Sequence, residues 1–223
     1  MAPTGVPYHI DWIWSNNSNV HVANHRDWFT TYTELKTHTG SIYTGDQNSV
    51  DVLGVGDVEL VLQTSKTDPT ASATVVLRDV LYCPSNTCNI FGHPILQDYG
   101  LITSKHDSRL LDKETGASAG LLDLGRLWRL RLVGHSATET SLSSNGIYMI
   151  NAAWSEAERA RWLAVKNQMS TALPPSTEEE KSWLKKHYGN EWKFLASHGL
   201  NLTKDDQRAE GHAILEAVMN DEE

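Results

Sequence analysis

The spacing of apolar residues changes once along this chain, shortly after Asn151. Up to that point apolar residues fall in short, partly alternating runs rich in β-branched side chains, which is typical of strands. Beyond it, capping residues are followed three positions later by an acidic residue, as in Ser155 with Glu158, which marks a helix start. This change predicts an α+β fold, with a mainly antiparallel β domain over residues 1–151 and a helical domain over residues 152–223.

The individual elements follow from the same patterns. Strands are predicted at 50–56, 58–63, 74–82, 110–112, 120–124, 127–132 and 146–150. About four helices are predicted, at 155–171, 177–189, 190–198 and from 203 onward. The helical core is expected to contain Trp162, Trp183, Trp192 and Phe194. The Ser- and Thr-rich stretch 134–145 predicts a loop, so we expect limited proteolysis to cut between Gly134 and Gly146 or near Pro174-Pro175.

Composition and charge exclude several classes of function. The net charge is −9 and both halves are acidic, so neither has the basic surface that binds nucleic acid. No run approaches the roughly 20 apolar residues of a membrane helix, and residues 1–7 lack the features of a secretion signal, so we expect an intracellular protein. The spacing of Cys83 and Cys88 fits no zinc pattern, which predicts reduced thiols and no metal or cofactor.

Four segments carry the most specific motifs in the sequence. In the first, Trp12 is followed by Ser15-Asn16-Asn17-Ser18, then His21, with Phe29 downstream. The second contains Gly54 and Gly56 in a Gly-x-Gly arrangement. The third reads Leu-Arg-Asp-Val-Leu-Tyr-Cys-Pro from Leu77 to Pro84, and the fourth runs from Asn89 through Gly92 to Gly100.

In order and spacing these segments resemble the protease region of Copia-type retrotransposon polyproteins. That region reads Trp, two residues, Asp-Ser-Gly-Ala, two residues, His. The resemblance covers about Ile10 to Leu132, and we recognise no family in the helical region. It implies a retropepsin-like β-barrel with Gly54 and Gly56 in a flap-like segment. It also implies structural roles for Trp12, His21, Asp79, Pro84, Asn89 and Gly92.

The resemblance also identifies a missing catalytic group. Aspartic proteases need two carboxylates that share a proton and a water, one from each subunit of a retroviral-type dimer. In this sequence Ser15 stands at the Asp position, Asn16 at the Ser, Asn17 at the Gly and Ser18 at the Ala. A serine cannot ionise near neutral pH, so the motif is degenerate and we predict no catalytic residue there.

Three other arrangements of reactive side chains offer alternatives to this interpretation. Asp11 is the nearest carboxylate, but it lies four residues early and no turn follows it. His9, His21 and His25 suggest a metal site, although alternation around His21 indicates a strand, where residues four apart lie about 13 Å from each other. The residues Ser15, Ser18, His21 and Asp27 suggest a serine hydrolase, but the sequence contains no nucleophile elbow.

Together these observations favour a non-catalytic, transposon-derived binding or interaction module. The alternatives are a hydrolase that uses a different residue set in the old protease cleft, and an inactive relic of a retroelement. We expect an unidentified protein partner and neither nucleic acid nor membrane as partner. A homodimer is left open.

Overall fold

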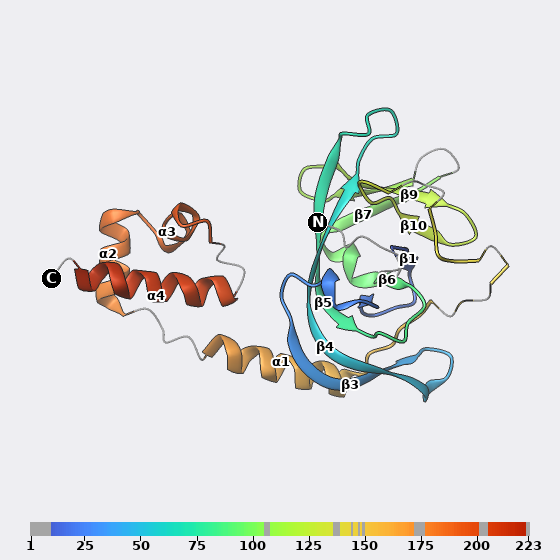
Figure 1. The fold of residues 1–223 in the computed structure, drawn as a ribbon, viewed down its shortest axis with the longest axis horizontal. Helices are drawn as coiled ribbons and strands as arrows, with labels where there is room; N and C mark the ends of the chain where they lie inside the picture. Colours follow the sequence, from blue (N-terminus) through green and yellow to red (C-terminus); the bar gives the residue numbers. More distant parts are fainter. Residues whose placement is uncertain are drawn as a thin grey trace. The chain divides into compact units, whose positions relative to one another are not determined.

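In the part of the chain that the computed structural model describes, ten strands form one continuous sheet (Figure 1). The structure describes residues 10–104, 108–135, 139–143, 145–146, 148, 150–171, 177–200 and 205–221. The strands are β1 (Trp12–Ser15), β2 (Val22–Ala23), β3 (Thr33–Ser41), β4 (Gly45–Gln63), β5 (Ser72–Tyr82), β6 (Asn89–Gly92), β7 (Tyr99–Thr103), β8 (Ser108–Asp112), β9 (Ser118–Leu124) and β10 (Trp128–Leu130). Two short 3-10 helices, Arg26–Trp28 and His93–Gln97, interrupt them.

The sheet is mainly antiparallel and is not closed. Its strand order is β3-β4-β5-β2-β6-β1-β10-β9-β8-β7, so β3 and β7 lie at its two ends. Among the pairs between these strands, only β1 with β6 and β2 with β5 are parallel. The predicted α+β layout is therefore confirmed, whereas the closure of the sheet into a retropepsin-like barrel is not observed.

The longest strand, β4, unites two strands that the sequence analysis kept apart at Asp57. It pairs with β3 on one side and with β5 on the other, and the ladder to β5 shifts register between Gly56 and Val58. The extra residue of this β-bulge lies in β5, where three steps from Val80 to Leu77 match two steps in β4, so β4 continues without interruption. The alternating buried residues Val58, Leu60 and Leu62 show why the chain stays extended beyond it.

Apolar side chains from many strands of the sheet form a large core. Trp12 is fully buried and its ring meets that of Trp28 edge-on, with ring centroids 5.4 Å apart. Phe91 and Leu110 are also fully buried in this cluster. Because β1 supplies both Trp12 and Trp14 to it, the motif around residues 12–18 is anchored by core packing.

Four helices follow the sheet: α1 (Glu156–Thr171), α2 (Glu178–His187), α3 (Glu191–Ser197) and α4 (Asp205–Asp221). The capping box of Thr177 and Glu180 opens α2 as predicted, and Gly189 follows it with a φ of +87°, a conformation that favours glycine. Phe194 is buried in the helical core, as predicted. Trp192 is 60% exposed, so its predicted place in that core is wrong.

The predicted strand at 146–150 lies partly outside the described residues, and Gly146, Tyr148 and Ile150 are in no strand. The predicted start of the last helix at Thr203 is likewise outside them.

The chain divides into two compact units, which we call the β unit (to Glu158) and the helical unit (from Arg159). The predicted boundary between Asn151 and Ala152 lies a few residues earlier. Ala152 to Trp154 fall in the β unit because Ala153 bridges Gly40 and Trp154 hydrogen-bonds to Asn19. None of the described helices combines the length and apolarity that a membrane crossing requires.

Candidate functional site

The turn at residues 15–18 is held together by hydrogen bonds between its own residues. Ser15 ends β1, and Asn16 and Asn17 form an exposed turn after it. The backbone N–H of Ser18 donates to the carbonyl of Ser15 at 3.4 Å, and its hydroxyl donates to the Ser15 hydroxyl at 2.8 Å. Ser15 is 5% exposed and Ser18 is fully buried. The Ser15 side chain is therefore enclosed by the protein.

Hydrogen bonds also connect this turn to Ala152 and Trp154, near the end of the β unit. The backbone N–H of Ala152 donates to the Ser18 hydroxyl at 2.8 Å. Asn19 reaches Trp154 through two side-chain hydrogen bonds, one donated by Nδ2 at 2.9 Å and one accepted by Oδ1 at 2.8 Å. The Ser18 hydroxyl is thus engaged as both donor and acceptor.

The motif residues His21 and Gly92 meet behind this turn. The Nδ1 atom of His21 accepts a 3.0 Å hydrogen bond from the backbone N–H of Gly92. Burial lowers the pKa of His21 to about 4, although Asp79 acts in the opposite direction. A Cβ on Gly92 would lie 2.3 Å from the carbonyl oxygen of Val20, so only glycine fits. His21 and Gly92 therefore have structural roles in the packing of the β unit.

The two glycines of the predicted flap-like segment lie in the middle of β4 and not at a hairpin tip. Gly54 pairs with both β3 and β5, and Gly56 pairs with β5. A Cβ on Gly54 would lie 2.3 Å from the Tyr32 ring, and one on Gly56 would lie 2.0 Å from the Thr31 carbonyl oxygen. The structure thus differs from the flap-like expectation, because these glycines permit a close approach of the segment at Thr31 and Tyr32 to the strand.

The remaining motif residues shape the backbone. Asp79 has a φ of +53°, in the left-handed region, and its N–H donates to Asp57 Oδ1 at 3.2 Å across the β4–β5 bulge. Pro84 follows β5 in a turn that the Asn86 N–H closes onto the Cys83 carbonyl at 3.0 Å. The buried Asn89 accepts a 2.9 Å hydrogen bond from the backbone N–H of Asn24.

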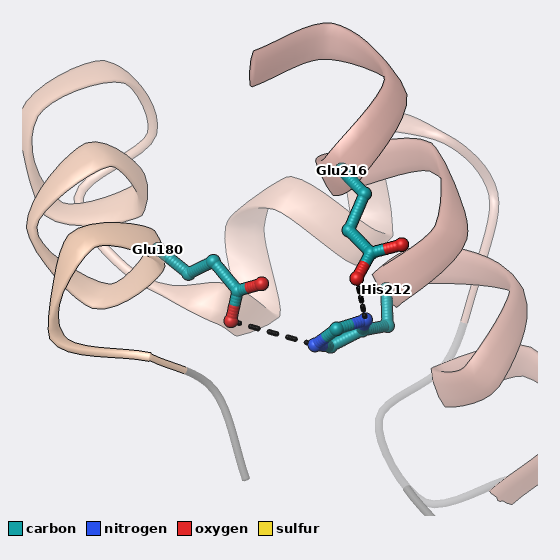
Figure 2. Close-up of side chains that lie close together, drawn as sticks. All are labelled: Glu180, His212 and Glu216. Atoms are coloured by element: carbon teal, nitrogen blue, oxygen red, sulfur yellow. Dashed lines mark ion pairs between the residues drawn. The ribbon is translucent and has the colours of Figure 1, made fainter. Parts of the chain in front are cut away.

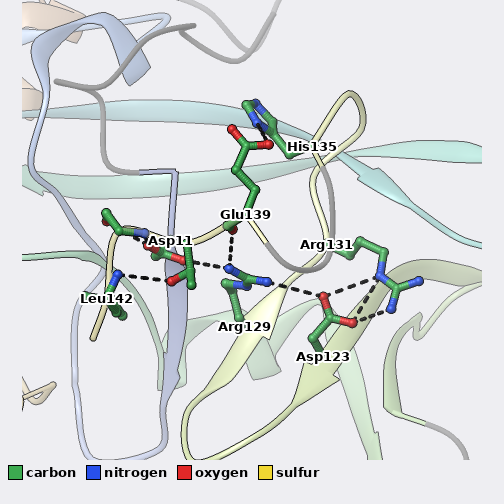
Figure 3. A network of polar contacts seen from close by, with 9 residues as sticks. Asp11, Asp123, Arg129, Arg131, His135, Glu139 and Leu142 are labelled. Atoms are coloured by element: carbon green, nitrogen blue, oxygen red, sulfur yellow. Dashed lines mark hydrogen bonds and ion pairs between the residues drawn. The ribbon is translucent and has the colours of Figure 1, made fainter. Parts of the chain in front are cut away.

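A network of charged contacts surrounds Asp11, and sequence reasoning did not find it (Figure 3). Its Oδ1 accepts a 2.9 Å hydrogen bond from Arg129 Nη1. Its Oδ2 accepts from the backbone N–H of Ser141 at 2.9 Å and from the Ser141 hydroxyl at 2.8 Å. Burial alone raises the pKa of Asp11, but the hydrogen bonds from Arg129, Ser141 and Thr140 outweigh it and hold the pKa below its ordinary value.

The network extends through a second carboxylate. Arg129 Nη2 lies 3.8 Å from Asp123 Oδ2, and Arg131 Nε donates to Asp123 Oδ1 at 3.1 Å. Arg129 Nη1 also donates to the backbone carbonyl of Glu139 at 2.5 Å. Two arginines thus balance two aspartates, and the Asp11 carboxylate has hydrogen bonds on both oxygens. Such a carboxylate is poorly placed to accept a proton from a water or substrate.

A cavity of about 370 Å³ opens beside this network. Asp11, Asp123 and Arg129 contribute to its polar side. Its apolar lining comes from Ile13, Leu124, Leu127, Leu142 and Tyr148. Neither Ser15 nor Ser18 lines it. Its volume falls within the range of small-ligand pockets, about 300–1,000 Å³.

The other reactive arrangements considered from the sequence are differently placed. Ser15 and Ser18 hydrogen-bond to each other, and the Nδ1 atom of His21 is taken by Gly92, so these side chains do not form a nucleophile–base pair. His25 Nδ1 accepts from the Asp27 N–H at 3.2 Å, and His9 lies outside the described residues.

The two cysteines are free and buried. Burial raises the pKa of both thiols, that of Cys88 to about 12. They are therefore unreactive thiols rather than nucleophiles at neutral pH.

Residues 12–101 match the family model of the Pol polyprotein beta-barrel domain. The match supports a domain derived from a retroelement Pol polyprotein, which we call the Pol-type domain. It runs from β1 into β7 and includes the Ser15 turn, His21, Gly54, Gly56 and Gly92. Asp123, Arg129 and the helical unit lie beyond it. Neither the curated proteins nor the solved structures that were searched gave a match.

Proposed function

We propose that the β unit is a non-catalytic binding module derived from a Copia-type retrotransposon protease. The observation that carries the proposal is the hydrogen bond between the buried hydroxyls of Ser15 and Ser18. A group that hydrolyses peptides must hold and deprotonate a water, and neither hydroxyl is available for this. The residue substitutions at Ser15, Asn16 and Asn17 support a degenerate protease motif. We further propose an intracellular location.

The hydrolase alternative would need another acid–base group near a cavity. Among the described residues of the β unit, Asp11 is the buried carboxylate that lines one. Its two oxygens accept from Arg129 and Ser141, and its lowered pKa keeps it ionised at neutral pH. This arrangement is typical of a structural ion pair, so it favours the binding module over the hydrolase.

The cavity beside Asp11 is the proposed site for a protein partner. Its five apolar residues form a surface for an apolar side chain, and the charged network beside it has hydrogen-bonding groups for the backbone of a peptide. We therefore propose that a short peptide segment of a partner inserts an apolar side chain there. A second copy of the chain is one such partner, so a homodimer remains part of the proposal.

Peptide display against the full-length chain tests this site. Peptides selected from a random library should carry an apolar anchor, and Leu124→Asp should weaken their binding by about tenfold or more, because it places a charge in the apolar wall. Ile102→Asp is the matched control, since Ile102 is 40% exposed, close to the 42% of Leu124, and does not line the cavity. Failure to select any peptide, or equal effects of both substitutions, would refute the site.

A further inference from the structure

Three side chains that can ligate a metal ion converge in the helical unit (Figure 2). Glu180 comes from the first turn of α2, and His212 and Glu216 come from α4. One ligand atom from each lies within 4.8 Å of the others. His212 and Glu216 are four residues apart, so they project from the same face of their helix. Figure 2 shows the imidazole of His212 between the two carboxylates.

The carboxylate of Glu180 is held in place before any ligand binds. Its Oε2 atom accepts a 2.7 Å hydrogen bond from the backbone N–H of Thr177, and the Thr177 hydroxyl accepts from the Glu180 N–H at 3.1 Å. The Glu180 side chain is 9% exposed. Hydrogen bonds of this kind orient the ligands of metal ions and reduce the entropy lost on binding.

The His212 imidazole points an unsatisfied nitrogen at this carboxylate. Its Nε2 atom is buried and makes no hydrogen bond, although it lies 3.4 Å from Glu180 Oε2. Its Nδ1 atom lies 3.7 Å from Glu216 Oε1. A buried polar atom without a hydrogen bond is costly unless another partner satisfies it. A cation held between the three residues would supply that partner.

We propose that Glu180, His212 and Glu216 form a binding site for a divalent cation, with zinc as the best match. One imidazole nitrogen and two carboxylate oxygens suit a borderline ion such as zinc better than calcium or magnesium, which prefer all-oxygen sites. The site has three protein ligands, and Glu216 is 59% exposed, so water can complete the coordination. This proposal departs from the sequence expectation of no metal site.

The cation would join α2 to α4. The apolar core formed by α2, α3 and α4 is small, with Leu184, Phe194, Leu195 and Leu215 as its buried members. Domains of this size bury little surface and often depend on a metal or a disulfide for part of their stability. The site therefore has a structural role in this proposal.

The competing interpretation is a protonated His212 that bridges two carboxylates without any metal.

The test uses the full-length chain, treated with a chelator and dialysed, and then titrated with zinc by calorimetry. We expect His212→Gln to abolish the site and Glu216→Gln to weaken it by about tenfold or more. Glu210→Gln is the matched control, because Glu210 is exposed on the same helix and outside the cluster. Zinc at about 100 times its Kd should raise the unfolding midpoint of the helical signal by roughly 10 °C.

X-ray absorption at the zinc edge provides a second readout. The bound ion should show nitrogen and oxygen ligands at about 2.0–2.2 Å, and the imidazole contribution should disappear in His212→Gln. Circular dichroism checks that each variant keeps its helices, and the exposed Glu216 keeps the test informative if His212→Gln unfolds. Absence of zinc binding would overturn the proposal in favour of the ionic bridge. So would a zinc affinity of Glu216→Gln equal to that of the control variant Glu210→Gln.

Discussion

The hydroxyl of Ser18 accepts a 2.8 Å hydrogen bond from the backbone N–H of Ala152, which lies 134 residues further along the chain. Both residues are buried. Replacing Ser18 with alanine should leave that N–H without its acceptor, and a buried unsatisfied donor costs about 1–3 kcal/mol. We expect Ser18→Ala to lower the free energy of unfolding by this amount in urea denaturation. Ser85→Ala, at an exposed position, should change it by no more than about 0.5 kcal/mol. Equal effects of the two substitutions would show that the hydrogen bond between Ser18 and Ala152 contributes nothing to the free energy of unfolding.

Proteolytic activity is the second prediction. The purified chain should show no pepstatin-sensitive cleavage of peptides between about pH 3 and 8, with an active retropepsin-type enzyme as the positive control. Ser15→Asp alone should not restore activity, because Asn16 and Asn17 still replace the hydroxyl and the glycine of the motif, and Ser15 is buried. Pepstatin-sensitive cleavage that disappears in Asp11→Asn would contradict the pseudoenzyme interpretation.

The ion pair of Asp11 and Arg129 is expected to matter for stability. The Asp11 side chain is fully buried and that of Arg129 is 14% exposed, so solvent screens the pair weakly. Arg129→Met should cost about 3–5 kcal/mol, because it leaves a buried carboxylate without its cation. Lys181→Met breaks the exposed pair with Glu178 and should cost less than about 1 kcal/mol. Equilibrium unfolding of both variants compares them, and a loss below about 1 kcal/mol in Arg129→Met would reject the argument.

Acid should destabilise the β unit through His21. Burial lowers its pKa from 6.5 to about 4, so between these values the unfolded chain binds a proton that the native chain excludes. The stability due to neutral His21 is complete above about pH 6.5 and is lost as the pH falls to about 4, by up to roughly 3 kcal/mol. His21→Asn keeps a hydrogen-bond acceptor but cannot titrate, so its stability should fall less steeply over this range. The exposed His93→Asn is the control, and a slope in His21→Asn equal to that of the control would exclude this role.

The two units are expected to be separable. Each has its own buried core, built around residues such as Trp12 in the β unit and Phe194 in the helical unit. Limited proteinase K digestion near Pro174-Pro175 should release a stable helical fragment. A cut between Gly134 and Gly146 should leave its two pieces associated, because Ala152 and Trp154 hydrogen-bond to Ser18 and Asn19. A chain that resists cutting in both places and unfolds in one step would disprove separability.

Local signals allowed the helices and several strands to be predicted. The capping box of Thr177 and Glu180 involves residues three apart, and the structure contains both of its hydrogen bonds. Ser155 was predicted to cap α1 in the same way, and its hydroxyl accepts the Glu158 N–H at 3.3 Å. The Glu158 carboxylate also accepts a 2.5 Å hydrogen bond from the Thr37 hydroxyl, a contact between residues 121 apart that no local signal predicts.

The charged network could not be predicted, because its members are far apart in the sequence. The alternation of residues 127–132 correctly indicated a strand with one polar face. It did not show that this face would be covered, with Arg129 bound to Asp11, 118 residues away, and to the backbone of Glu139. Trp12 was recognised as a motif residue but not as part of a strand, since four residues are too few to show an alternating pattern.

The position of β1 in the sheet has a consequence for producing parts of this protein. β1 lies between β6 and β10, and Ile13 pairs with Arg129 on the β10 side. A fragment limited to residues 12–101 would lack β10 and would leave β1 as an edge strand carrying Trp12, Ile13 and Trp14. Unpaired apolar edges recruit other chains and promote aggregation. Recombinant expression of the family-matched segment alone should therefore give insoluble material, and the same hazard applies to a nascent chain until β10 has left the ribosome.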